Sequence, residues 1–201
     1  MPIDRSYATE RIDMLVRGGF FAPDWIEERV REDCFLPSDV TPEDAKWLAA
    51  EVARHCSAKL EDETSWPTVT DWDRLDAAFA AMEAAGIIAL HQAGTEQSDG
   101  WTEVAEVYHV AGYEASGAIG FCFYHQQDVE IAIKGYGLTL SFGDIDGDLL
   151  MADPVKAVAI GQRVVAELDK VGFHTVWNGQ VNRRIEIPSL IWQKRHRPST
   201  K

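Results

Sequence analysis

The sequence contains few cysteines and no cysteine motif. Its three cysteines, Cys34, Cys56 and Cys122, are odd in number and widely spaced, and no two form a C-x-x-C pair. This pattern argues against a disulfide framework and against a zinc site. It is typical of a protein kept in a reducing compartment, so we predict a cytoplasmic location.

Long apolar runs are also missing. No stretch approaches the roughly 18 apolar residues that a membrane-spanning helix needs. The first residues, MPIDRS, contain no apolar segment of the kind found in a signal peptide. We therefore predict neither secretion by a signal peptide nor insertion into a membrane. With 201 residues, the chain can bury a hydrophobic core without help from a metal or a disulfide.

Positive charge is scarce. The chain has 19 Lys and Arg against 33 Asp and Glu, which gives a formal net charge of −14. A body with this charge repels phosphate backbones, so direct nucleic-acid binding is not expected. The excess is explained by solubility alone, or by a surface that covers a basic protein partner.

Common ligand-binding motifs are absent too: there is no G-x-G-x-x-G, P-loop or H-E-x-x-H. Asp144, Asp146 and Asp148 resemble the start of a calcium loop. An EF-hand needs a carboxylate at the twelfth place of that loop, and Val155 stands there. We therefore predict no metal ligands and no cofactor. A weak magnesium or calcium site at the three aspartates stays open as the alternative.

Residues 1–66 are predicted to form a helical N-terminal segment packed on the rest of the chain. Three helices are expected, and the third has the clearest start. Thr41 is a favoured N-cap residue, Pro42 suits the first helical position, and Asp44 follows three residues after the cap.

Residues 67–201 are predicted to form an α/β domain. Apolar runs without alternation are typical of strands that are covered on both faces. Asn178-Gly179 is a strong signal for a tight hairpin turn near the C-terminus. The expected class is therefore α/β (α+β), with a mixed sheet of about five strands, packed helices and a C-terminal β-hairpin. The expected strands are Ile87–Leu90, Ala118–Tyr124, Leu138–Phe142, Phe173–Trp177 and Gln180–Ile187.

Polar residues follow three of these strands directly. Ligands in sheets of parallel strands bind beyond the carboxyl ends of the strands. The expected strand ends, at His91-Gln92, Tyr124-His125 and Phe142-Gly143, should therefore lie on one rim. His91, His125 and Asp128 are candidate acid–base or metal groups, because imidazole titrates near neutral pH. The alternative is that each histidine bonds a loop carbonyl.

The stretch before Trp101 is the second candidate region. Ser98 or Asp99 is expected as the N-cap of a helix, and the alternative is an anion or carbonyl-oxygen site built from backbone groups at the helix start. Ser98 lacks the G-x-S-x-G elbow of a nucleophile. The candidate ligand-binding residues are Gln92, Gly94, Ser98, Asp99, Gly100, Trp101 and Tyr124.

These motifs resemble those of a family of bacterial proteins that carry a domain of unknown function. The resemblance covers most of the chain and implies a fold and site positions, but no reaction. Where a second glycine would give His-Gly-Gln-Asp, this chain has Gln126. The matching segments are Trp66-Pro67, Asp73–Phe79, Ala93-Gly94, Gln97–Trp101, Phe121–His125, Gln127-Asp128, Phe142-Gly143 and Trp177 with Gly179.

Three functions are compatible with this sequence. The first is a non-catalytic acidic binding protein, such as an inhibitory or immunity-type protein that masks a basic partner surface. Its seven tryptophans could anchor an interface. The second is a small bacterial enzyme that uses His91, His125 and Asp128, with Ser98–Gly100 holding a substrate oxygen. The third is a small-molecule sensor that uses the same crevice, including Tyr124–Asp128, without chemistry.

Overall fold

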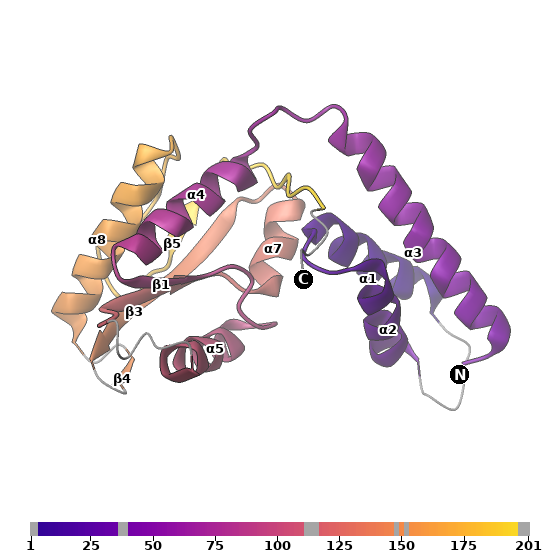
Figure 1. Ribbon diagram of the computed structural model, residues 1–201, viewed down its shortest axis with the longest axis horizontal. Coiled ribbons are helices and arrows are strands. Elements are labelled where there is room, and N and C mark those ends of the chain that lie inside the picture. Colours follow the sequence, from indigo (N-terminus) through magenta and orange to yellow (C-terminus); the bar gives the residue numbers. More distant parts are fainter. Residues whose placement is uncertain (1–3, 36–39, 111–116, 147–148, 151–152, 197–201) are drawn as a thin grey trace. The chain divides into compact units, whose positions relative to one another are not determined.

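The computed structural model describes residues 4–35, 40–110, 117–146, 149–150 and 153–196. The chain forms two compact units (Figure 1). Unit 1 comprises Met1–Thr70 together with Gln193–Lys201, and unit 2 comprises Asp71–Trp192. The C-terminal residues therefore group with the N-terminal helices, while the division into domains 1–66 and 67–201 stays a prediction.

Unit 1 is built from helices α1 (Arg5–Gly18), α2 (Pro23–Cys34) and α3 (Pro42–Glu63). The start of α3 is the predicted one. The Thr41 side chain accepts from the Asp44 N–H at 3.1 Å, and the Asp44 carboxylate accepts from the Thr41 N–H at 3.3 Å. This capping box satisfies two backbone donors that the helix itself leaves unpaired.

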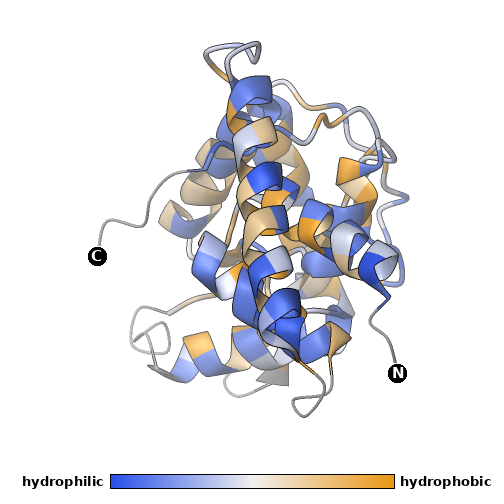
Figure 2. Ribbon diagram, turned by 90° about the vertical axis from the view of Figure 1, so that its right-hand side faces the viewer, coloured by the Kyte–Doolittle hydropathy of each residue, from blue (hydrophilic) through white to orange (hydrophobic). Residues whose placement is uncertain are grey.

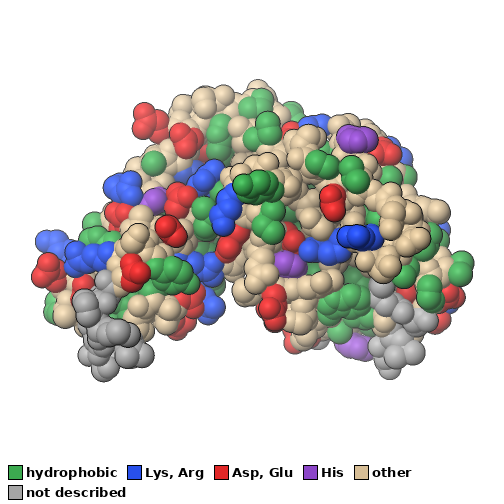
Figure 3. All heavy atoms as spheres, turned by 180° about the vertical axis from the view of Figure 1, so that it is seen from behind, with side chains coloured by type: hydrophobic (Ala, Val, Ile, Leu, Met, Phe, Trp, Pro, Cys, Tyr) green, Lys and Arg blue, Asp and Glu red, His purple; other side chains and the backbone are tan. Residues whose placement is uncertain are grey.

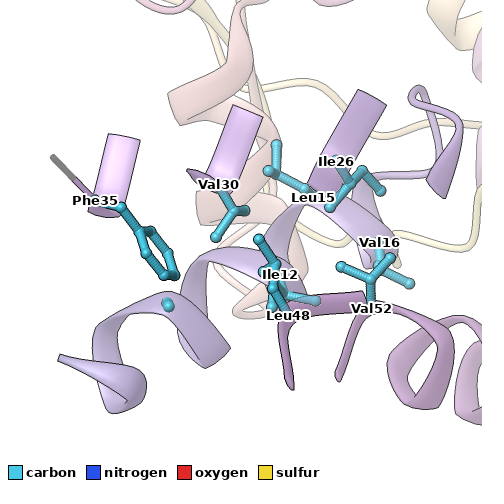
Figure 4. Packing of buried hydrophobic residues seen from close by; sticks show 9 residues of the cluster. Ile12, Leu15, Val16, Ile26, Val30, Phe35, Leu48 and Val52 are labelled. Atoms are coloured by element: carbon cyan, nitrogen blue, oxygen red, sulfur yellow. The ribbon is translucent and has the colours of Figure 1, made fainter. Parts of the chain in front are cut away.

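The core of unit 1 forms where the apolar stripes of the three helices meet. Figure 2 shows apolar and polar residues alternating around these helices, and Figure 4 shows the apolar side chains pointing toward one another. Such stripes supply most of the stability of an amphipathic helix. The buried members are Ala8, Ile12, Leu15, Val16, Ile26, Val30, Phe35, Leu48 and Val52.

Unit 2 contains a mixed sheet with strand order β1-β2-β3-β4, and β5 pairs with β3 off this path. β1 is parallel to β2, whereas β3 is antiparallel to β2, β4 and β5. The class is α+β with helices packed on a mixed sheet, as predicted. The strands are β1 (Ile87–Leu90), β2 (Gly120–Phe123), β3 (Leu138–Asp146), β4 (Leu149–Leu150) and β5 (Ile185–Ile187).

Helices cover both faces of this sheet. α5 (Gln97–Val110) packs on the face that carries Phe121 and Phe123. The alternate residue Gly120 faces Ile160 of α8 (Pro154–Lys170), which also packs against α4 (Asp71–Ala84). Successive residues of a strand point to opposite faces, so these contacts define two helical layers. Helix α7 (Gln126–Ile133) follows β2.

The predicted C-terminal hairpin forms only in part, and its second strand shortens to β5. Its first strand is reduced to a single bridge, in which Val176 and Glu186 exchange backbone hydrogen bonds of 2.8 and 3.0 Å. The Asn178-Gly179 turn does form, since Asn178 Oδ1 accepts from the Gln180 N–H at 3.0 Å. The chain after the turn does not continue as a strand, because the Trp177 indole N–H donates to the Gln180 and Arg183 carbonyls instead.

Cys34, Cys56 and Cys122 are free thiols. Among the described residues, no helix combines the length and the apolar character needed to cross a membrane.

Candidate functional site

The ends of β1 and β2 meet, as the sequence predicts. Leu90 pairs with Phe123 in the parallel ladder, so the residues that follow each strand leave the sheet side by side. The two connections are then tied by backbone hydrogen bonds. The Ala93 N–H donates to the Tyr124 carbonyl at 2.8 Å, and the Gln126 N–H donates to the Gly94 carbonyl at 3.1 Å.

The third strand does not contribute to this rim. Gly143 was expected just beyond a strand end, but it lies inside β3 and pairs with Phe121. Because β3 is antiparallel to β2, its carboxyl end is at the opposite edge of the sheet. The candidate crevice therefore has two walls and not the three that were predicted.

His91 and Tyr124 belong to a packed aromatic cluster beside α4. The Tyr124 hydroxyl is hydrogen-bonded to His91 Nδ1 at 2.8 Å, and His91 Nε2 lies 3.2 Å from Asp76. The imidazole stacks on Phe79, with ring centroids 4.3 Å apart. Burial raises the pKa of Tyr124 well above its usual value, so this hydroxyl is neutral at physiological pH and acts as a hydrogen-bonding group.

His125 and Asp128 belong to a different group of side chains at the start of α7. Asp128 is 3% exposed and accepts two hydrogen bonds from the Arg184 guanidinium, at 3.0 and 2.5 Å. Its Oδ2 also accepts from the His125 N–H at 3.1 Å and lies 3.1 Å from His125 Nε2. A two-pronged arginine contact of this kind is strong and directional.

This charged group is not fully satisfied. His125 Nδ1 and Arg184 Nε are buried and have no hydrogen-bond partner among the described residues. Burial lowers the pKa of His125, with the Asp128 carboxylate opposing the shift and the Arg184 guanidinium adding to it. The imidazole is therefore biased toward its neutral form.

The lowered pKa of His125 predicts a pH-dependent stability. The unfolded chain binds a proton on this side chain at a higher pH than the folded chain does. The contribution of neutral His125 is thus complete above a pH of about 6.5 and is lost as the pH falls through the folded-state pKa. We expect urea denaturation to show a larger loss of stability between pH 7 and pH 5 for the wild type than for His125→Gln. Equal losses in the two proteins would contradict this assignment.

The structure thus brings His91 and His125 to neighbouring strand ends but gives them separate partners. No hydrogen bond or ion pair between described residues joins the two groups. A shared catalytic role for the two histidines stays a prediction. Arg184 was not identified from the sequence as a residue of this site. Arg184 lies 56 residues from Asp128 in the sequence, and a separation of that length carries no motif.

Ser98, Asp99 and Gly100 were expected to precede the helix that carries Trp101. They lie instead in the first turn of α5. The Asp99 carboxylate accepts from the Thr95 and Glu96 N–H groups, at 3.0 and 3.1 Å. Asp99 therefore closes the first turn from within by satisfying two backbone donors of the segment that enters the helix, and its carboxylate places a negative charge beside the helix start.

Gly100 and Trp101 are packing residues of α5. A Cβ built on Gly100 would lie 2.2 Å from the Phe123 ring, so only glycine lets the helix approach the sheet this closely. Trp101 meets Phe121 edge-on, with ring centroids 5.2 Å apart. Gly94 has a φ of +65° and lies against Asp99, so it serves the turn that leads into the helix.

Gln92 is the one candidate with strained geometry. Its φ of +51° is the only positive value at a non-glycine residue among the described residues. Its Oε1 is buried and has no hydrogen-bond partner among them. Strain and an unsatisfied polar atom at one residue are features that often mark functional sites.

The aspartates of the calcium-like segment are engaged elsewhere. The Asp144 carboxylate accepts from the Asp153 N–H at 3.1 Å, and Asp146 pairs with Lys156 at 2.8 Å. Asp148 lies outside the described residues. In the part of the chain that is described, no group of three His, Cys, Asp or Glu is arranged to hold a metal ion.

Comparison with known proteins identifies the family. No curated protein and no solved structure matches the chain. Residues 2–196 match the family described as a domain of unknown function, DUF6891. This match covers nearly the whole sequence, so the chain belongs to the DUF6891 family.

Proposed function

We propose that this protein is a non-catalytic binding protein whose acidic surface covers a basic protein partner, as inhibitory and immunity-type proteins do. Three features support the proposal: the uneven distribution of charge, an acidic stripe on one helix, and the engagement of the candidate catalytic groups in structural contacts.

The negative charge is concentrated in unit 2. Residues 71–192 contain 18 Asp and Glu against 7 Lys and Arg, whereas the remainder of the chain contains 15 against 12. Unit 2 therefore accounts for most of the net charge of −14. A charge excess of this size attracts oppositely charged proteins and accelerates their association.

The observation that carries the proposal is an acidic stripe, which comprises Glu96, Asp99, Glu103 and Glu106. These residues recur every three or four positions from the start of α5, so they lie on one side of the helix. No Lys or Arg occurs anywhere between Arg74 and Lys134. Among the described residues, none of the four carboxylates pairs with a lysine or arginine. Asp99 accepts from two backbone N–H groups, while Glu96 and Glu106 are exposed and keep their charge available for a partner.

The stripe differs from acidic residues elsewhere on the protein. On the face seen in Figure 3, acidic side chains are scattered among basic and apolar ones. In unit 1 many carboxylates have a cationic neighbour, such as Glu51 with Arg54 at 2.7 Å and Glu27 with Arg31 at 2.9 Å. Charges that are neutralised in this way add little to the attraction of a partner.

The engagement of the histidines favours binding over catalysis. A general base must reach the proton that it abstracts. His91 is held by Tyr124 and Asp76, and His125 is held against Asp128. These contacts hold both imidazoles in place, while His125 Nδ1 has no hydrogen-bond partner among the described residues.

The test is capture of a partner by two variants with the same change in net charge. Glu96→Lys/Glu106→Lys reverses two exposed members of the acidic stripe, while Glu61→Lys/Asp62→Lys reverses two exposed residues at the end of α3. Affinity capture at low salt should recover one stoichiometric basic protein with the wild type and with the α3 variant. We expect the stripe variant to bind it about tenfold more weakly, a loss of about 1.4 kcal/mol.

The salt dependence provides a second readout, because the attraction between exposed charges is screened. Binding should weaken as the ionic strength rises, and less steeply for the stripe variant. Recovery of no stoichiometric partner at low salt, or equal binding by the two variants, would contradict the proposal.

The second candidate is a small-molecule sensor, or a small enzyme, that uses the polar residues at the ends of β1 and β2. The strained, unsatisfied Gln92 between His91 and the Gly94 turn favours it. A thermal-shift screen with metabolites and metal ions discriminates between the candidates, since a sensor is stabilised by its own ligand and a protein-binding module is not.

A further inference from the structure

A cavity of about 120 Å³ lies within unit 1, between the three N-terminal helices and the C-terminal segment. Most of its wall is apolar. At its edge, Pro23, Leu60 and His196 are exposed to solvent, so the cavity is open to small molecules. A cavity of about 150 Å³ accommodates benzene, so this one suits a ligand of about five or six non-hydrogen atoms. The apolar lining residues are Val16, Phe21, Pro23, Ile26 and Leu60.

One side of this cavity carries a buried amine. Lys59 is only 7% exposed. Its Nζ donates to the Val16 carbonyl at 3.0 Å and lies 3.8 Å from the Glu63 carboxylate. Lysine is almost never buried to this extent without a dedicated partner, and the Glu63 carboxylate is beyond hydrogen-bond distance.

We propose that the cavity binds a small apolar aldehyde and that the Lys59 amine captures it reversibly as an imine. A lysine that is desolvated in an apolar pocket is the usual form of an imine-forming nucleophile. The apolar wall accommodates the hydrocarbon part of the aldehyde, which places its carbonyl group at the amine. Glu63 and His196, which also line the cavity, are the polar groups beside it.

The covalent step is balanced without any further reactant. The ammonium group first loses a proton, for which the Glu63 carboxylate at 3.8 Å is the nearest acceptor. The neutral amine then adds to the carbonyl carbon, and the oxygen leaves as water with the two remaining amine hydrogens. A C=N bond replaces the C=O bond, and hydrolysis reverses the step.

The electrostatics of the cavity favour this role. Burial lowers the pKa of Lys59 to about 8; the nearby Lys194 ammonium adds to this shift and Glu63 opposes it. At pH 7 roughly 10% of such an amine is neutral, about two hundred times the fraction for an ordinary lysine. The other nucleophile in the cavity is Cys56, and burial raises the pKa of its thiol, so the amine is the more reactive group.

The structural alternative is that Lys59 only caps α1, because Val16 lies in the last turn of that helix. The two roles are separable on the unmodified protein. The protein is incubated at pH 7 with pentanal and cyanoborohydride, which reduces an imine to a stable secondary amine, and the labelled lysines are identified by peptide mass mapping. If Lys59 only caps α1, it should be labelled no faster than the exposed Lys134.

We expect Lys59 to be labelled about tenfold or more faster than Lys134, with a rate that rises with pH and levels off above a pH of about 8. Glyoxylate, an anionic aldehyde without an apolar chain, should show a much smaller preference for Lys59, because it gains nothing from the apolar wall. Leu60→Trp should slow labelling by narrowing the opening, while Leu60→Ala should not. Equal labelling of Lys59 and Lys134 by pentanal, or the same preference with glyoxylate, would overturn the proposal.

Discussion

Replacing Asp128 with alanine is expected to lower the free energy of unfolding by about 3–5 kcal/mol, the usual cost of breaking a buried ion pair by removing one partner. Asp128 is 3% exposed and accepts two hydrogen bonds from Arg184 and one from the His125 N–H. Its removal leaves a guanidinium group in a largely buried position without its counter-charge. Urea denaturation of the purified variants measures the change.

Two comparisons show whether the ion pair is the cause. Gln127→Ala changes the exposed neighbour of Asp128 on the same helix and should alter stability by less than about 0.5 kcal/mol. The double variant Asp128→Leu/Arg184→Met removes both charges and should recover part of the loss, because no buried charge is left unpaired. If Asp128→Ala behaves like Gln127→Ala, the contact with Arg184 is not important for folding.

The local features of the fold were predictable because they depend on neighbouring residues. The capping box of Thr41 and Asp44 has both of its members within one turn of helix. Ile87–Leu90 was predicted as a buried strand from four consecutive apolar residues, and its first three residues are fully buried or nearly so. Signals of this kind need no knowledge of the rest of the chain.

The direction of β3 was not predictable in the same way. An apolar run indicates that a strand is buried, but it does not indicate whether the strand runs parallel or antiparallel to its neighbour. β3 follows the short helix α7 yet pairs antiparallel with β2. The position assigned to Gly143 depended on that direction, so it failed together with the three-walled crevice.

Contacts between side chains that are far apart in the sequence could not be predicted. Asp128 and Arg184 are 56 positions apart, and the amine of Lys59 meets the Val16 carbonyl across 43 positions. No spacing rule connects residues this far apart. A buried lysine could have been suspected only because Lys59 lies between the apolar residues Cys56 and Leu60 of a helix.

Replacing Gly100 with alanine is expected to lower the free energy of unfolding by about 2–3 kcal/mol, the cost of forcing extra volume into a packed core. This change in stability has the opposite sign to the one usually found for glycine to alanine in a helix. In an ordinary helix interior, glycine is about 1 kcal/mol less favourable than alanine, so the same change would be stabilising. Here the added Cβ would lie 2.2 Å from the Phe123 ring, which is fully buried.

The Phe123 ring has little freedom to move aside, because Trp101 and Phe121 lie against it. α5 must therefore move away from the sheet and lose contacts along its buried face. Thr102→Ala, an exposed change on the same helix, should alter stability by less than about 0.5 kcal/mol. Adding Phe123→Leu to Gly100→Ala should provide room for the Cβ. The double variant should then lose less unfolding free energy than the two single variants lose together.

This experiment also decides between two roles for Gly100. If the glycine allows the backbone to approach a ligand, Gly100→Ala should leave the fold stable, or stabilise it as in any helix. If the glycine allows the helix to approach the sheet, the variant should lose stability and Phe123→Leu should restore part of it. The 2.2 Å separation favours the second role, and a stabilised Gly100→Ala protein would overturn it.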